Sequence, residues 1–338
     1  MTKNLITGIG GFVASHLAEL LLSKGEEVIG TYRWTEDLSR IEHIKDKITM
    51  IPMDLNDLSS CIKAMKKKPD YIFHLAAQSY VGDSYSNPHI TIETNTLGTL
   101  NLLEAVRIGQ KNQAYVYTEE KKWDPIVHIC SSSEVYGLVT KDLVPIKENC
   151  RFNPSNPYAV GKVGADMVAL MYWTNYGIKT IRTRMFTHTG PGRTMLSAEV
   201  AFAKQIAEFE KKGITDYVLD GFKLKHGNLE SIRTWADVRD AVKAYWLLVR
   251  KGKPGEVYNI GGDTTKTVGE MLDYLLMLSP LKDKIKKVQD PKLMRPYDVT
   301  LQIPDCSKFK KDTGWKPEIT FEQTMTDLLN YWRENVRK

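Results

Sequence analysis

The stretch TGIGGFVA, residues 7–14, decides the fold, because it puts three glycines between a strand and a helix. The residues NLI before it belong to a short apolar segment that predicts a strand. FVASHLAELLLSKG, residues 12–25, has the apolar spacing of a helix that Gly25 closes. EEVIGTYR, residues 26–33, predicts a second strand. A strand, a helix and a strand in this order indicate a parallel βαβ unit.

The same alternation continues to about residue 190. Further strands are predicted at 47–55, 70–77, 125–133 and 178–186, and helices at 58–68, 96–109 and 158–177. After GPG, residues 190–192, the regular alternation ends. We therefore expect an α/β fold, with a Rossmann-type doubly wound parallel sheet in residues 1–190. Residues 191–338 are expected to form mainly a smaller mixed α/β substrate lobe, with later chain crossings back to the sheet.

Composition narrows the class of protein. At 338 residues, with 42% hydrophobic content, the chain can bury a large core. The net charge of +6 comes from Lys and Arg that acids interrupt, which indicates solvated faces rather than a nucleic-acid surface and suits an anionic small molecule. No apolar run approaches the roughly 20 residues of a membrane span, and a strand begins at once in MTKNLITGIGGF. We expect no signal peptide, no membrane partner and a cytoplasmic location.

Two further features bear on partners. The four cysteines are scattered and form no CxxC motif and no Cys/His cluster, so we expect neither a disulfide framework nor a metal site. The connection at 110–124 is longer than a usual link between a helix and a strand, and such loops tend to serve a function or face a partner.

The glycine turn predicts a dinucleotide site. A turn of this kind lets a pyrophosphate meet backbone N–H groups at the start of a helix. Gly8, Gly11 and Ala14 follow a TGxxGxx[GA] form, which resembles the short-chain dehydrogenase/reductase superfamily and implies a nicotinamide cofactor. The residues expected to hold it there are Gly8, Gly10, Gly11, Phe12 and Val13.

The end of the second strand bears on which cofactor is used. NAD-specific sites usually have an acid there to hold the ribose 2′-hydroxyl. This chain has Arg33, which suits a 2′-phosphate, so NADP is favoured over NAD. The alternative is that Arg33 is a solvated strand-end residue. The resemblance implies further cofactor contacts at Asp54, Leu55, Ala76, Ala77, Gln78 and Asn95.

A catalytic set is predicted from two motifs. Tyr158 and Lys162 stand one helical turn apart in NPYAVGK, so both point from the same helix face, and they would also contact the cofactor. We expect the lysine ammonium and a nicotinamide cation to lower the pKa of the phenol and make it a base. In SSSEVYG, residues 131–137, Ser132 takes the catalytic serine position of the family and Glu134 is a candidate acid/base. A solvated turn with helix-capping residues is the alternative for this stretch.

Several segments resemble one branch of the superfamily, the enzymes acting on GDP-mannose and GDP-4-keto-6-deoxymannose. They are AQSYVGDSYSNP, LGTLNLLEAVR, NPYAVGK, GNLESIRTWADVRD, MRPYDV and GWKPEIT. The branch implies a GDP-sugar substrate whose diphosphate is held by Arg233 and Arg295, since guanidinium matches phosphate. Either could instead be a surface ion-pair partner. The other substrate candidates are Ser84, Ser133, Arg193 and Asn228.

Two reactions on this scaffold remain open. As a 4,6-dehydratase, Tyr158 assisted by Ser132 would take the O4 proton while C4 gives a hydride to NADP+. Glu134 would then remove the C5 proton and assist loss of the C6 hydroxyl, and the hydride would return to C6. As a 4-reductase, the enzyme would take hydride from NADPH to C4, with Tyr158 as the proton donor.

The motifs divide between these reactions. SSSE and LSRIEHI resemble the dehydratases, whereas GPG and the spacing before GNLES resemble the reductase. The reductases can also carry SSE, so Glu134 leaves both reactions open. Thr187 departs from the usual Asn of relatives. We expect the dehydratase acting on GDP-mannose. A GDP-heptose substrate and a non-catalytic dinucleotide-binding regulator are further alternatives, and the resemblance implies a homodimer or homotetramer.

Overall fold

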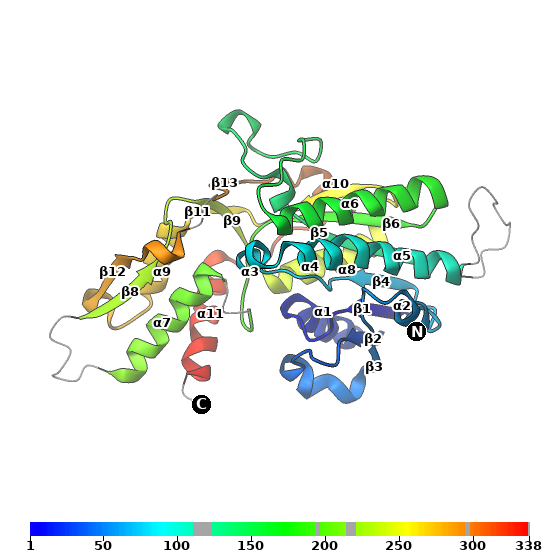
Figure 1. The fold of residues 1–338 in the computed structure, drawn as a ribbon. Coiled ribbons are helices and arrows are strands. Elements are labelled where there is room, and N and C mark those ends of the chain that lie inside the picture. Colours follow the sequence, from blue (N-terminus) through cyan, green and yellow to red (C-terminus); the bar gives the residue numbers. More distant parts are fainter. Residues whose placement is uncertain (111–122, 194–196, 214–220, 295–297, 337–338) are drawn as a thin grey trace.

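A computed structural model of the protein describes residues 1–110, 123–193, 197–213, 221–294 and 298–336. It has two lobes, a larger one built on a parallel sheet and a smaller mixed one that lies to one side of it (Figure 1). The predicted fold class is therefore confirmed. The boundary near residue 190 stays a prediction.

The sheet of the larger lobe has seven strands in the order β10-β6-β5-β4-β1-β2-β3, and each neighbouring pair is parallel. The chain winds outward from β1 in both directions, so the strand order reverses between β1 and β4. In such sheets ligands bind at the carboxyl ends of the strands, next to this reversal. The strands are β1 Lys3–Thr7, β2 Glu27–Tyr32, β3 Thr49–Pro52, β4 Tyr71–His74, β5 Ile126–Ser132, β6 Thr180–Met185 and β10 Val257–Ile260.

Helices cover both faces of this sheet. One apolar core lies under α1 and α8, and the other lies under α2, α5 and α6, which is why the central strands are apolar along most of their length. The helices of this lobe are α1 Phe12–Ser23, α2 Leu58–Met65, α3 Val81–Ser86, α4 Pro88–Ile92, α5 Gly98–Gly109, α6 Pro157–Tyr176, α8 Val238–Lys251 and α10 Ser307–Thr313. Shorter helical turns are η1 Ser39–Lys47, η2 Glu93–Leu97, η3 Ser133–Tyr136 and η4 Lys141–Leu143.

A buried ion-pair cluster fixes α6 on the sheet. The carboxylate of Asp166, in α6, lies 3.0 Å from Nη1 of Arg182 and 2.9 Å from Nε of Arg184, both on β6. All three side chains are buried, and such a pair resists disruption because removing one partner leaves an uncompensated charge. The helix that carries Tyr158 and Lys162 is thereby held in place along its length.

The smaller lobe has its own apolar core. A sheet with the order β11-β9-β13, to which β7 adds beside β9, and the pair β12-β8 pack with three helices. Its elements are β7 His188–Thr189, α7 Ala198–Lys212, β8 Phe222–His226, β9 Ile232–Asp237, β11 Thr264–Thr267, α9 Val268–Met277, η5 Lys282–Lys284, β12 Ile285–Gln289, η6 Pro291–Leu293, β13 Leu301–Gln302 and α11 Phe321–Asn335. Between these elements the chain returns to the larger lobe as α8, β10 and α10.

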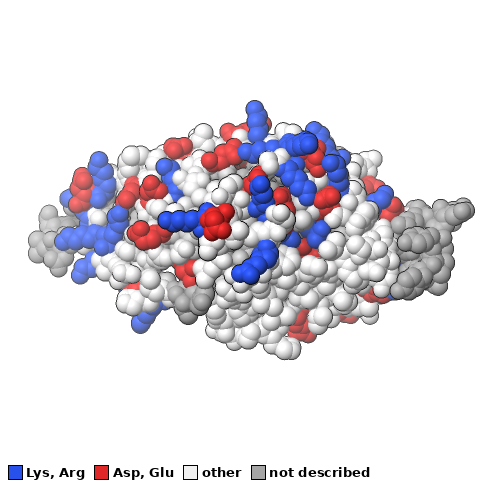
Figure 2. All heavy atoms as spheres, turned by 90° about the horizontal axis from the view of Figure 1, so that it is seen from above, with Lys and Arg blue, Asp and Glu red and all other residues white. Residues whose placement is uncertain are grey.

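The surface separates into charged and uncharged areas. In Figure 2, Lys and Arg are mixed with Asp and Glu over the upper part of the view, and the lower part shows fewer charged side chains. Within the described ranges, no helix has both the length and the apolar content needed to cross a membrane. Most of the long connection predicted at 110–124 lies outside the described residues.

Candidate active site

The glycine turn closes onto the neighbouring strand end. Gly8 has φ +67°, in the left-handed region that favours glycine, and a Cβ there would lie 3.1 Å from Cα of Ala76. Helix α1 begins at Phe12, and its N-cap Gly11 gives no side-chain cap; its first turn holds no acid. Its first N–H groups and the positive end of its dipole are left for an anionic ligand, which suits a dinucleotide pyrophosphate.

A carboxylate already contacts this turn. Oε1 of Glu36 accepts a hydrogen bond from the Gly10 N–H at 3.1 Å, and its Oε2 accepts one from the Arg33 N–H at 3.3 Å. Burial raises the pKa of Glu36. The Arg33 side chain is exposed just after β2, and its predicted contact with a 2′-phosphate stays a prediction. The sequence analysis did not predict Glu36, although an acid three residues after Arg33 could have indicated a carboxylate near the glycine turn.

The other predicted cofactor residues border the same edge of the sheet. Gln78 and Asn95 are joined by two hydrogen bonds of 2.9 and 3.0 Å between the Asn95 amide and the Gln78 backbone. The Thr7 hydroxyl accepts from the N–H of Ala76 at 3.0 Å, which holds the ends of β1 and β4 together. Asp54 is exposed, and its Oδ1 accepts from the Asn56 N–H at 2.9 Å. Leu55 follows it in the chain, Ala77 precedes Gln78, and Phe12 and Val13 are the first residues of α1.

The Tyr158–Lys162 pair lies at the start of α6. The helix is capped by Asn156, whose Oδ1 accepts from the Ala159 N–H at 2.8 Å. Nζ of Lys162 donates to the Cys130 carbonyl at 2.7 Å and lies 5.9 Å from the centre of the Tyr158 ring. Ser132 is a hydrogen-bond partner of the Tyr158 phenol, so three of the four predicted catalytic residues, Ser132, Tyr158 and Lys162, form one cluster at the end of β5.

The predicted lowering of the Tyr158 pKa needs both Lys162 and a nicotinamide cation, and it stays a prediction. Burial raises the pKa of Tyr158 well above its usual value, and the hydrogen bond from Ser132 and the charge of Arg193 only partly oppose it. Burial also lowers the pKa of Lys162. Desolvation penalises the charged form of each group, and it is the largest cause of both pKa shifts. A positively charged nicotinamide ring near the phenol would act in the lowering direction.

Glu134 is held beside this cluster by two amides. Its Oε2 accepts from Nδ2 of Asn156 at 3.2 Å, and its Oε1 accepts from Nε2 of Gln302 at 3.0 Å. The Ser132 hydroxyl accepts from the Glu134 N–H at 3.2 Å, which starts the turn η3. Sequence reasoning missed both amides. Asn156 stands in NPY next to Tyr158, whereas no local signal marks Gln302.

The predicted substrate residues fall in different places. Arg233, on β9, lies 3.9 Å from a carboxylate oxygen of Asp298, and Nδ2 of Asn228 donates to the same carboxylate at 2.8 Å. Ser133 is buried in η3, and Ser84 is buried in α3 with its hydroxyl bonded to a backbone carbonyl. Arg295 lies outside the described residues.

Arg193 is placed near the glycine turn. Its Nε lies 2.8 Å from a carboxylate oxygen of Glu199, and its guanidinium carbon lies 5.6 Å from the centre of the Phe12 ring. Phe12 is also stacked on the ring of His188, with 6.3 Å between the ring centres. This placement favours a role for Arg193 on the cofactor side, and its predicted substrate contact stays a prediction.

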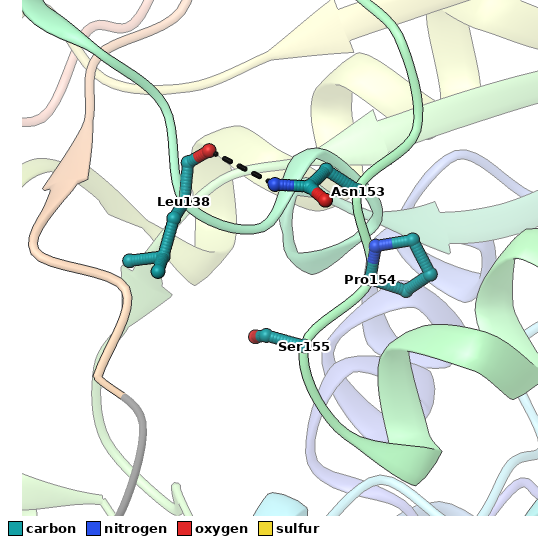
Figure 3. Close-up of a pocket in the computed structure, with 4 residues that line it drawn as sticks. All are labelled: Leu138, Asn153, Pro154 and Ser155. Carbon is teal, nitrogen blue, oxygen red and sulfur yellow. Dashed lines mark hydrogen bonds between the residues drawn. The ribbon is translucent and has the colours of Figure 1, made fainter.

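A cavity opens beside the catalytic turn (Figure 3). It has a volume of about 300 Å³ and is lined by Leu138, Asn153, Pro154 and Ser155. Asn153 donates from its N–H to the Val135 carbonyl and from its amide to the Leu138 carbonyl, so the segment that leads into α6 is tied to the catalytic turn and to the residue after it. The Ser155 hydroxyl oxygen is buried and has no hydrogen-bond partner within the described chain. A polar ligand group fits such an opening.

The fold and this cluster define a class, an enzyme of the short-chain dehydrogenase/reductase type that takes a nicotinamide dinucleotide. A family model described as GDP-mannose 4,6 dehydratase matches residues 5–328. The chain therefore belongs to the GDP-mannose 4,6 dehydratase family.

Relatives in the family carry out two reactions. GDP-6-deoxy-D-mannose reductase of Pseudomonas aeruginosa is 32% identical over 339 residues, with 100% of each chain covered. GDP-mannose 4,6-dehydratase of Yersinia enterocolitica is 32% identical over 367 residues, covering 97% of this chain and 93% of the relative. The solved structure of RMD from Pseudomonas aeruginosa complexed with NADPH is similar with a TM-score of 0.79 and 28% identity, covering 99% of this chain and 100% of that one.

Proposed function

We propose that the protein is an NADP-dependent 4,6-dehydratase that converts GDP-mannose to GDP-4-keto-6-deoxymannose. The observation that carries this proposal is the placement of the Glu134 carboxylate, which two amides hold beside the Ser132–Tyr158 pair. A reductase needs a proton donor at O4, which Tyr158 supplies. Elimination of water also needs a base for C5 and an acid for the C6 hydroxyl, and Glu134 is the carboxylate placed to serve both.

Each residue then has a defined task. Ser132 orients the O4 hydroxyl, and Tyr158 takes its proton. Lys162, anchored on the Cys130 carbonyl, places its ammonium on the same side of α6. Glu134 removes the C5 proton and passes a proton to the leaving C6 hydroxyl, which departs as water. When hydride adds to C6, C5 takes up one proton, which balances the O4 proton that Tyr158 removed. The bound nicotinamide supplies the hydride acceptor at C4 and the hydride donor at C6.

The proposed cofactor is NADP. Arg33 is exposed at the strand end where a 2′-phosphate would lie, and a similar solved structure contains NADPH. The proposed substrate is a GDP-sugar, whose diphosphate would meet Arg233 of the smaller lobe and, as the family resemblance implies, Arg295.

The test is incubation with GDP-mannose and a trace of NADP+, followed by mass spectrometry. We expect loss of one water from the sugar nucleotide with cofactor far below stoichiometric. Tyr158→Phe should abolish turnover with cofactor binding retained, because the phenol oxygen is the base. Turnover that survives in this variant would overturn the catalytic assignment.

The second candidate is GDP-4-keto-6-deoxymannose 4-reductase. It is favoured by the full-length match to the Pseudomonas aeruginosa reductase, which covers 100% of both chains. In that case GDP-mannose would give no product, and the keto sugar would oxidise NADPH mole for mole. The two reactions therefore give opposite results in the same pair of assays.

We also propose a homodimer formed through α4, η2 and α6. Large apolar side chains are exposed there, with Ile90 at 56%, Leu97 at 51% and Met167 at 43%. A second copy of this chain would cover them, since patches of this kind mark interaction sites. Light scattering should give twice the 38.5 kDa chain mass, and Met167→Glu should lower the measured mass toward that of one chain. A monomeric wild type would contradict the proposal.

We also propose a cytoplasmic location. All four cysteines are unpaired, which favours it.

A further inference from the structure

One residue of the smaller lobe contacts the proposed acid/base group. Gln302 lies on β13 and is only 4% exposed. Its Nε2 donates to Oε1 of Glu134 at 3.0 Å, across 168 positions of sequence. Within the described ranges no Lys or Arg forms an ion pair with Glu134, so neutral amide donors hold the carboxylate.

The backbone around Gln302 is fixed to the catalytic turn by a second route. The Ile146 N–H donates to the Ile303 carbonyl at 2.8 Å, and the Asp305 N–H donates to the Ile146 carbonyl at 2.8 Å. That carbonyl also accepts from Nδ2 of Asn259, and Asn259 accepts from the Tyr136 hydroxyl at 2.7 Å. Tyr136 belongs to the same turn as Glu134. The separation between β13 and the turn is therefore set by the packing, and the Gln302 side chain spans it.

The same strand belongs to the proposed diphosphate site. β13 pairs with β9 in parallel, and the register sets Gln302 opposite Arg233. The Ile232 N–H also donates to the Thr300 carbonyl at 2.7 Å. The backbone of β13 therefore pairs with the strand that carries Arg233, the arginine expected at the phosphates. The Gln302 side chain contacts Glu134, the carboxylate expected at C5.

We propose that Gln302 is a positioning residue that completes the acid/base group from the smaller lobe and holds the Glu134 carboxylate toward C5 and C6 of the sugar. This inference rests on the proposed dehydratase function. An amide suits the task, because it orients the carboxylate in one direction without the strong charge pairing that would oppose proton uptake. Asn156 orients the other oxygen from the larger lobe.

The test is Gln302→Met, which keeps the length of the side chain and removes its N–H donor. The expected dehydration kcat falls about 10- to 100-fold, the range of a lost hydrogen bond to a charged group, and KM for GDP-mannose changes less than about threefold. Oxidation at C4 uses Ser132 and Tyr158 and should continue. Reduced nicotinamide should therefore accumulate during a single turnover in the variant and not in the wild type.

Two controls separate positioning from a general structural effect. Gln323→Met removes a matched amide-to-carboxylate hydrogen bond, to Asp327 on exposed α11, and should leave kcat unchanged. In a Glu134→Gln background, Gln302→Met should add little to the loss, because both changes act on one carboxylate. If Gln302→Met folds poorly, Gln302→Glu keeps the size and replaces the donor by an acceptor, and the same kinetic pattern is expected.

The outcomes are distinct. A kcat within about twofold of wild type, or an independent loss in the Glu134→Gln background, would overturn the role of Gln302. A wild type that releases no water from GDP-mannose but reduces the keto sugar would overturn the proposed function, and the inference with it. A wild-type dehydratase with an unchanged Gln302→Met would leave the function standing and refute only the inference.

Discussion

At the scale of single residues, burial competes with charge throughout this site. Lys162 and Tyr158 share one helix face, yet burial moves the pKa of the lysine down and that of the tyrosine up. Each group is thus pushed toward its neutral form. A base at Tyr158 requires positive charge nearby, and a bound nicotinamide cation would add to that of Arg193.

Glu36 allows a prediction about cofactor choice. Its carboxylate bonds the backbone N–H groups of Gly10 and Arg33, close to where a 2′-phosphate would lie. Glu36→Gln keeps an oxygen for the Gly10 N–H and removes the negative charge. The affinity for NADP+ should rise about fivefold, and the affinity for NAD+ should change less. Titration calorimetry measures both. Glu42→Gln, an exposed acid on η1, is the control, and an equal change for both cofactors would contradict the prediction.

At the scale of elements, the N-terminus of α6 serves stability and catalysis together. Asn156 caps the helix with its oxygen and holds Glu134 with its nitrogen. The cap on α11 has only the first task, since Thr320 accepts from the Gln323 N–H. The two caps therefore form a matched pair.

Asn156→Ala and Thr320→Ala should each lower the free energy of unfolding by about 1 kcal/mol. Only Asn156→Ala should also lower kcat, because it removes a donor from the Glu134 carboxylate. Urea unfolding and steady-state kinetics on both variants give the comparison. Equal effects on kcat would show that Asn156 acts only through the helix.

At the scale of the whole molecule, buried histidines link stability to pH. Burial lowers the pKa of His74 and of His128 to about 3 and that of His188 to about 4, from 6.5. The unfolded chain binds these protons below about pH 6.5 and the folded chain does not. The unfolding free energy should therefore be highest above that pH and fall as the pH drops toward about 4.

The expected slope approaches about 1.4 kcal/mol per pH unit for each histidine below its unfolded pKa. His128→Gln should reduce this slope by about 1.4 kcal/mol per pH unit, the contribution of one titrating histidine. His89→Gln removes a histidine that is 89% exposed and should leave it unchanged. Urea unfolding at a series of pH values gives the slopes, and an identical slope for wild type and His128→Gln would contradict the assignment.

Local patterns in the sequence determined the fold class and the core of the site. TGIGGFVA marks one strand end, SSSEVYG another, and NPYAVGK one helix face, and each pattern reports on residues that are neighbours in the chain. Because parallel strands end at one edge of a sheet, these three motifs had to meet. The family resemblance follows from the same motifs.

The tertiary structure alone decided the rest. It joined Gln302 to Glu134 over 168 positions, set Arg193 beside Phe12, and desolvated the Tyr158 phenol, which raises its pKa in the protein without cofactor. Contacts of this kind depend on how two lobes pack, and desolvation depends on everything around a group. Neither is encoded in the spacing of any one motif.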